Sequence, residues 1–221
     1  MKLNKIAIAV GAAVMGLSGI AQAELSANIG ATSNYIWRGV TQADDGAAIS
    51  GGIDYGHESG FYAGTWASTI DGGEELDLYA GFGGEANSIG YDVGVIYYAY
   101  PGGDDLDFTE IYASLSFGPV TGGIAYTIDK EADGDENDLY YHLSAGTDLG
   151  DGWGLSATVG YYDMEAADSD YSHGQIDVTK SMGDLGDFTF SLSNVFDDDI
   201  TVAADKRDND LIPFISWSKS F

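Results

Sequence analysis

From residue 24 onward, apolar and polar residues alternate with a period of two, which predicts β-strands that each have one apolar face. In the first predicted strand the apolar face holds Leu25, Ala27, Ile29, Ala31, Tyr35 and Trp37, and the polar face holds Ser26, Asn28, Thr32, Asn34 and Arg38. Further strands are expected to begin near Ile49, Phe61, Leu76, Ile89, Leu106, Val120, Leu139, Trp153, Tyr171, Phe188 and Leu211. About twelve strands result, with roughly 16 residues for each strand and its turn, which suits membrane strands of about 9–11 residues.

The connections between these strands alternate in length and charge. The long, acidic ones are TQADDG, DGGEE, PGGDD, DKEADGDEND, DMEAADSD and DDDITVAADKRDND, and the short ones are HESG, GGEANS, GP, GDG and GDLG. A barrel that spans an outer membrane has short turns on its periplasmic rim and longer loops outside. The pattern therefore predicts an all-β fold, a transmembrane antiparallel up-and-down barrel of about twelve strands with both termini on the periplasmic side.

The first 23 residues have the features of a secretory signal peptide. Lys2 and Lys5 precede an apolar run over residues 6–20, and Ala21-Gln22-Ala23 matches a small-x-small cleavage site. A membrane anchor is the alternative, but about 15 apolar residues is short for a span of roughly 20. We expect residues 1–23 to be cleaved and residues 24–221 to form the barrel.

The charge balance excludes some classes of partner. Acidic residues outnumber basic ones by 36 to 8, so nucleic acid would be repelled. The chain has no Cys, hence no disulfide framework, and an exported chain of this kind suits the outer membrane of a Gram-negative bacterium. The expected surroundings are outer-membrane lipids and lipopolysaccharide.

The C-terminus supports the same location. The chain ends at Phe221, which shares an apolar face with Ile215 and Trp217, although Lys219 interrupts that face. Outer-membrane barrels typically end in an aromatic-terminated strand that the barrel-assembly machinery reads, so Phe221 is the expected assembly signal.

Two segments resemble a known family. Residues 34–42, NYIWRGVTQ, and residues 48–68, AISGGIDYGHESGFYAGTWAS, are similar to the proteobacterial Gcw_chp family, whose members are also called TorF family porin-like proteins. The resemblance implies an outer-membrane barrel with a porin-like role, and it defines the fold better than the solute.

Arg38 is the candidate of greatest interest, because it is the basic residue that lies within a predicted strand on the polar face. An unpaired buried charge is costly, so we expect Arg38 to pair with Asp54 or Glu58 of the next strand. The pair either fixes the strand register or forms a charged constriction. Further candidates for the lumen are Asp77, Asp92, Glu110, Tyr112, His142, Gln175 and Asp177. Inward glycines such as Gly94 and Gly160 either leave room for a pore or let bulky side chains pack across it.

Motifs for catalysis and cofactor binding are absent from the sequence, so no enzyme activity and no cofactor is predicted. His142 and Ser144 would share a face, as in some outer-membrane lipid hydrolases, but the predicted register turns them to the lumen rather than to lipid. DGDEND at Asp133–Asp138 resembles the start of a calcium loop but lacks its glycine and its final carboxylate. Weak capture of divalent cations by acidic loops remains an alternative to a solvated loop.

The sequence therefore predicts a porin-like channel for passive diffusion of small solutes. Because lumen carboxylates favour cations over anions, the channel is expected to prefer cations. The alternatives are a closed structural or adhesive barrel whose acidic loops do the work, and an outer-membrane lipid hydrolase.

Overall fold

The computed structural model describes residues 24–103, 105–131, 137–165, 170–196 and 210–221. The predicted signal peptide lies outside the described residues, and so does most of the calcium-loop-like segment. Within the described residues no helix is long and apolar enough to cross a lipid bilayer.

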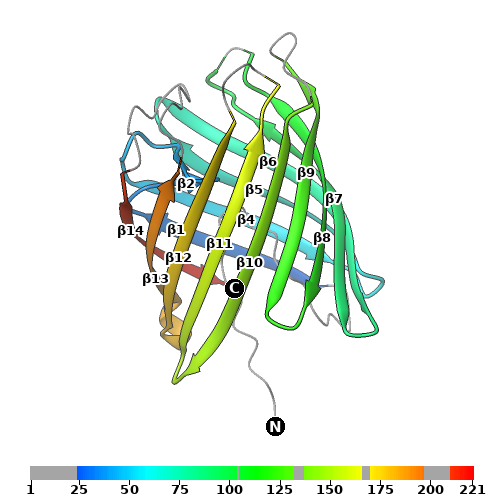
Figure 1. Ribbon diagram of the computed structural model, residues 1–221, viewed down its shortest axis with the longest axis vertical. Helices are drawn as coiled ribbons and strands as arrows, with labels where there is room; N and C mark the ends of the chain where they lie inside the picture. Colours follow the sequence, from blue (N-terminus) through cyan, green and yellow to red (C-terminus); the bar gives the residue numbers. More distant parts are fainter. Residues whose placement is uncertain (1–23, 104, 132–136, 166–169, 197–209) are drawn as a thin grey trace.

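Twelve strands form a closed antiparallel barrel (Figure 1), as the alternation predicts. The barrel strands are β1 (Glu24–Thr32), β4 (Ala48–Gly56), β5 (Phe61–Ile70), β6 (Gly73–Ala86), β7 (Ile89–Ala99), β8 (Phe108–Phe117), β9 (Val120–Lys130), β10 (Leu139–Gly150), β11 (Trp153–Asp163), β12 (Tyr171–Ser181), β13 (Asp187–Val195) and β14 (Ile212–Ser220). Each strand pairs with its neighbour in the chain, and β1 closes the barrel by pairing with both β4 and β14. A single 3₁₀ turn, η1 (Gly183–Leu185), joins β12 to β13.

The connections sort onto two rims. The short rim carries short turns such as the one between β8 and β9. The first residues of β1 and the last residues of β14 lie at the same rim, where Ala27 and Phe221 are joined by backbone hydrogen bonds. The opposite rim, which we call the loop rim, carries the longer connections. One predicted loop is shorter than expected: DGGEE contains only a two-residue turn, because β6 already begins at Gly73 and places Glu75 inside a strand.

The first predicted strand is too long. β1 ends at Thr32, and the chain then folds into a separate hairpin of β2 (Ile36–Trp37) and β3 (Val40–Thr41). Arg38 and Gly39 form the tip, with φ of 49° and 90°, and two positive φ values are what a tight two-residue hairpin loop requires. The alternation in sequence continues through residue 37 because the hairpin is itself a strand pair. Tyr35, expected to face outward with Trp37, is buried instead.

The outer surface of the barrel is apolar. Large exposed side chains cover it, among them Leu25, Ile29, Ile53, Leu78, Val93, Leu115, Leu143 and Val159. Near the short rim the exposed side chains include several aromatic ones: Phe61, Phe82, Tyr91, Phe117, Trp153, Phe188 and Phe221. An apolar band bordered by an aromatic girdle is typical of barrels in membranes, and water would be a poor solvent for this surface.

An arginine on this surface therefore tests for contact with lipid. Leu143, near the middle of β10, is 53% exposed, so Leu143→Arg should lower the free energy of unfolding in vesicles by about 2–4 kcal/mol. Thr147→Arg, on the same face of β10 but nearer the short rim, should cost only about 0–1 kcal/mol. Denaturant titrations followed by tryptophan fluorescence measure both, and equal, negligible losses would contradict a lipid-facing surface.

Candidate functional site

The β2–β3 hairpin lies inside the barrel and reaches its far wall. It leaves the barrel wall at the end of β1, and its tip binds β8, which is seven strands from β1 in one direction around the barrel and five in the other. Arg38 Nη1 donates to Glu110 Oε1 at 2.8 Å and Nη2 to Oε2 at 2.6 Å, a bidentate ion pair. The two side chains are only 9% and 2% exposed. A charged clasp thus holds the hairpin across the lumen.

Aromatic rings surround the guanidinium. The Arg38 Cζ atom lies 4.1 Å from the ring centre of Trp37, 4.2 Å from that of Tyr140 and 4.9 Å from that of Tyr162. Burial alone would lower the pKa of Arg38, but Glu110 together with the neighbouring Tyr162 and Tyr98 outweighs burial and raises that pKa above its ordinary value. The guanidinium is therefore charged at every physiological pH.

The rest of the hairpin is also fixed to the wall. Tyr35 Oη donates to Glu75 Oε1 on β6 at 2.8 Å, and Tyr100 Oη donates to Glu75 Oε2 at 3.0 Å. Burial and the neighbouring Glu75 carboxylate raise the pKa of Tyr35 well above its ordinary value, so it acts as a neutral donor. On the opposite side, Val40 packs with Tyr171 in a buried cluster. The hairpin is held from several sides of the barrel.

The predicted partners of Arg38 are wrong. Asp54 faces the interior, but it accepts hydrogen bonds from Asn28 and Tyr79 instead. Glu58 lies in the turn between β4 and β5 and is exposed, because β4 ends at Gly56. Since Arg38 belongs to an inserted hairpin and not to a wall strand, its partner is set by where the tip reaches and not by strand adjacency.

The other predicted side chains fall into separate groups along the wall. Glu110 holds Arg38, whereas Asp92 accepts from Tyr62 Oη at 2.6 Å, and Tyr62 also bonds to Tyr112. Asp177 accepts from Gln175 at 2.8 Å and from Ser191 at 2.6 Å.

Asp77 is the exception, because it is 6% exposed and one of its oxygens, Oδ1, is buried without a hydrogen-bond partner in the described structure.

Sequence reasoning missed Glu75, which is 2% exposed and binds the hairpin. Its position two residues before Asp77 was a usable signal, since residues i and i+2 share a strand face. The acidic, glycine-rich run that contains it predicts a loop, which hides its place in β6. Tyr35 is missed because the alternation continues through the hairpin and predicts an outward face for it.

The inward glycines accommodate rings. A side chain at Gly94 would meet the Tyr112 ring, and one at Gly160 would meet Tyr140 and His173. Of the two roles that the sequence left open for these glycines, the structure shows packing of bulky side chains at both positions.

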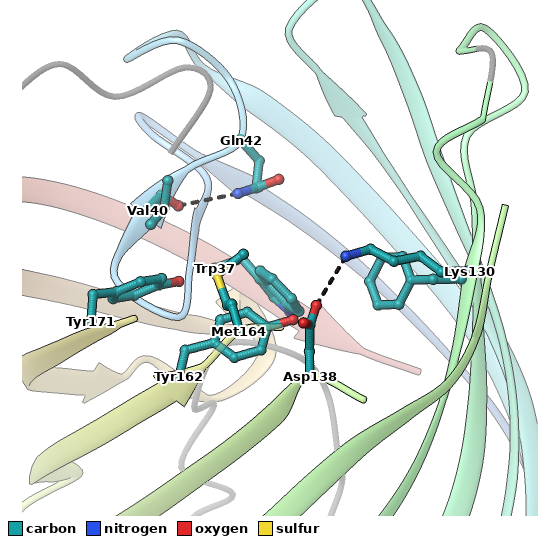
Figure 2. Close-up of a pocket in the computed structure, with 9 residues that line it drawn as sticks. Trp37, Val40, Gln42, Lys130, Asp138, Tyr162, Met164 and Tyr171 are labelled. Atoms are coloured by element: carbon teal, nitrogen blue, oxygen red, sulfur yellow. Dashed lines mark hydrogen bonds and ion pairs between the residues drawn. The ribbon is translucent and has the colours of Figure 1, made fainter. Parts of the chain in front are cut away.

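A small cavity opens beside the hairpin near the loop rim (Figure 2). Its volume is about 180 Å³, and it is lined by Trp37, Val40, Gln42, Phe108, Lys130, Asp138, Tyr162, Met164 and Tyr171. Lys130 Nζ pairs with Asp138 Oδ2 at 2.9 Å across it. The charges of this second ion pair cancel locally.

The hydrolase hypothesis gains no support from the geometry. His142 and Ser144 share the partly buried, inward face of β10, and the described structure has no hydrogen bond between them. The His142 ring instead stacks near Tyr140, with 5.8 Å between ring centres. Among the described residues, no group of three or more acidic, histidine or cysteine side chains is arranged to hold a metal ion.

Solved outer-membrane channels share the fold at low sequence identity. The KdgM porin is 6% identical with a TM-score of 0.60, over 89% of this chain and 98% of its own. The same porin in complex with disordered oligogalacturonate is 6% identical with a TM-score of 0.59, over 89% and 97%. The COG4313 outer membrane channel from Pseudomonas putida F1 is 8% identical with a TM-score of 0.55, over 92% and 97%. No curated protein sequence matches this chain.

A bacterial family described as being of unknown function, Gcw_chp, matches residues 18–210, which include every strand from β1 to β13 and the inserted hairpin. The chain therefore belongs to the Gcw_chp family.

Proposed function

We propose that this protein is an outer-membrane channel for the passive diffusion of small solutes and that the β2–β3 hairpin forms its constriction. The observation that carries the proposal is the hairpin itself, a segment folded inside a closed barrel and clasped to the far wall by Arg38 and Glu110. A segment inside a barrel narrows the path through it without opening the hydrogen-bonded wall. The fold shared with solved porins supports the same function.

The channel prefers cations. Arg38 is neutralised by Glu110, whereas Asp54, Asp77, Asp92 and Asp177 face the interior without a basic partner among the described residues. Rings of carboxylates attract cations and repel anions. The neighbour bound to oligogalacturonate holds an acidic saccharide, and this charge distribution argues against the same class of solute here.

The two ends of the chain and its acidic loops fit a location in the outer membrane. Residues 1–23 would direct export as a cleaved signal peptide, and Phe221 would present the terminal strand to the barrel-assembly machinery. The chain would then sit among lipids and lipopolysaccharide in the outer membrane of a Gram-negative bacterium, and its acidic loops would attract divalent cations. No catalytic role and no cofactor is proposed.

A closed barrel is the second candidate. The rings of Trp37, Tyr140 and Tyr162 around Arg38 favour it, because they fill the lumen beside the hairpin tip. In that case the acidic loops would be the functional part.

Selectivity tests the channel directly. In planar bilayers with a KCl gradient, the reversal potential of the refolded protein should lie on the potassium side, because the unpaired lumen acids repel chloride. High salt should reduce the preference where the acids are exposed to water. Reversal on the chloride side would contradict the assignment of the carboxylates, and a silent bilayer would favour the closed barrel.

If the ion pair between Arg38 and Glu110 holds the hairpin, it should contribute to the free energy of unfolding. Arg38→Ala should lower the free energy of unfolding, because removing one partner of a buried pair costs about 3–5 kcal/mol, and less where water enters. Glu110→Ala should have a similar effect, and the double variant should lose less than the sum of the two.

Thermal or denaturant unfolding measures this cycle. Asp54→Ala is the matched control, since Asp54 is an interior carboxylate that does not touch Arg38, and its effect should add to that of Arg38→Ala. Strict additivity between Arg38 and Glu110 would show that the ion pair does not hold the hairpin.

A further inference from the structure

The interior near the hairpin holds more carboxyl groups than its one guanidinium can pair with. Glu75, Asp77 and Glu110 all lie at the loop-rim ends of their strands, and all three are buried. Arg38 is fully engaged by Glu110 through both of its terminal nitrogens. Glu75 and Asp77 are left with no cationic partner in the described residues.

Asp77 lacks even neutral partners. Within the described residues its carboxylate accepts no hydrogen bond, its Oδ1 atom is shielded from solvent, and the side chain is 6% exposed. Its neighbours on the same face are Trp66 of β5 and Tyr98 of β7, its register partners on either side. A buried carboxylate without a partner is costly, and the described wall offers no donor that relieves it.

A proton alone does not complete this site. A protonated Asp77 would carry a hydroxyl donor, and Asp77 Oδ1 has no hydrogen-bond partner in the described structure. Protonation would remove the charge but leave an unsatisfied polar group.

A bound cation would supply the cationic partner that Glu75 and Asp77 lack, and it would also contact the Asp77 oxygens that have no hydrogen-bond partner. Glu75 and Asp77 share one face of β6 and are two residues apart, so their Cα atoms are separated by roughly 6.6 Å. Two carboxylates at that spacing can both contact one ion lying between them. Trp66 and Tyr98, the register partners of Asp77, place aromatic rings on the same face of the wall.

We propose that Glu75 and Asp77 form a binding site for a monovalent cation, such as potassium or sodium, beside the hairpin. The described residues hold no group of three acidic side chains arranged around one metal ion, so the site would be built on these two carboxylates, and potassium is the ion used to test it. The proposal deepens the channel function and rests on it only for the route by which the ion arrives. The site would be the first cation position inside the constriction.

Ion-specific stabilisation tests the site without any measurement of conduction. The refolded protein in detergent is unfolded thermally in KCl and in N-methyl-D-glucamine chloride at equal ionic strength. A bound ion stabilises the folded state by mass action, so potassium should raise the midpoint by roughly 5–10 °C at a hundredfold excess over Kd. Asp77→Asn should lose this response, because it removes one of the two ligand carboxylates.

Asp92→Asn is the matched control, since Asp92 is a lumen carboxylate that already has a hydroxyl partner, and it should keep the potassium response. Thallium anomalous scattering from crystals of the unmodified protein is the second readout, with a peak expected between Glu75 and Asp77. It decides the question if Asp77→Asn does not fold.

Two results would overturn the proposal: a midpoint that depends on pH but not on potassium, and a thallium map with no peak beside Asp77. Either one leaves the channel function standing if the reversal potential lies on the potassium side. A potassium response in a protein that does not conduct would sustain the site and contradict the channel.

Discussion

The ion pair between Arg38 and Glu110 is the interaction on which the interior depends. A short hairpin has little contact surface of its own, and a two-stranded hairpin by itself is marginally stable. The clasp ties its tip to β8, almost opposite the strand from which it emerges, and the aromatic rings beside it exclude water from the charges. Removing either charge would leave the other buried and would release the tip of the hairpin from the wall.

The barrel wall supplies the rigidity that this arrangement needs. Closure through β1 and β14 leaves the barrel without an open edge, so every barrel strand is fixed by two neighbours. Strand alternation then separates an apolar exterior from an interior of carboxylates and tyrosines. Tyrosine hydroxyls donate hydrogen bonds to several of these carboxylates, as Tyr62 does to Asp92.

The wall could be predicted from sequence and the hairpin could not. Period-two alternation and sorted connections give the strand number and the two rims, because side chains on a strand must alternate between lipid and lumen. The hairpin has the same alternation, so the sequence predicts that Tyr35 and Trp37 belong to the same strand as β1. The Arg38-Gly39 pair was the available sign of a turn. Which wall residue Arg38 meets depends on the diameter of the closed barrel, which no local pattern encodes. Glu75 is a different case, because its acidic, glycine-rich run predicts a loop although β6 already begins at Gly73.

The most direct test of the constriction is the single-channel conductance of a variant in which residues 34–41 are replaced by a glycine-serine linker, recorded beside the unmodified protein. If the clasped hairpin narrows the path, the variant should remain a heat-modifiable folded barrel and conduct severalfold more current per channel. Equal conductance from two folded proteins would show that the hairpin does not limit the flow of ions, and would contradict the account.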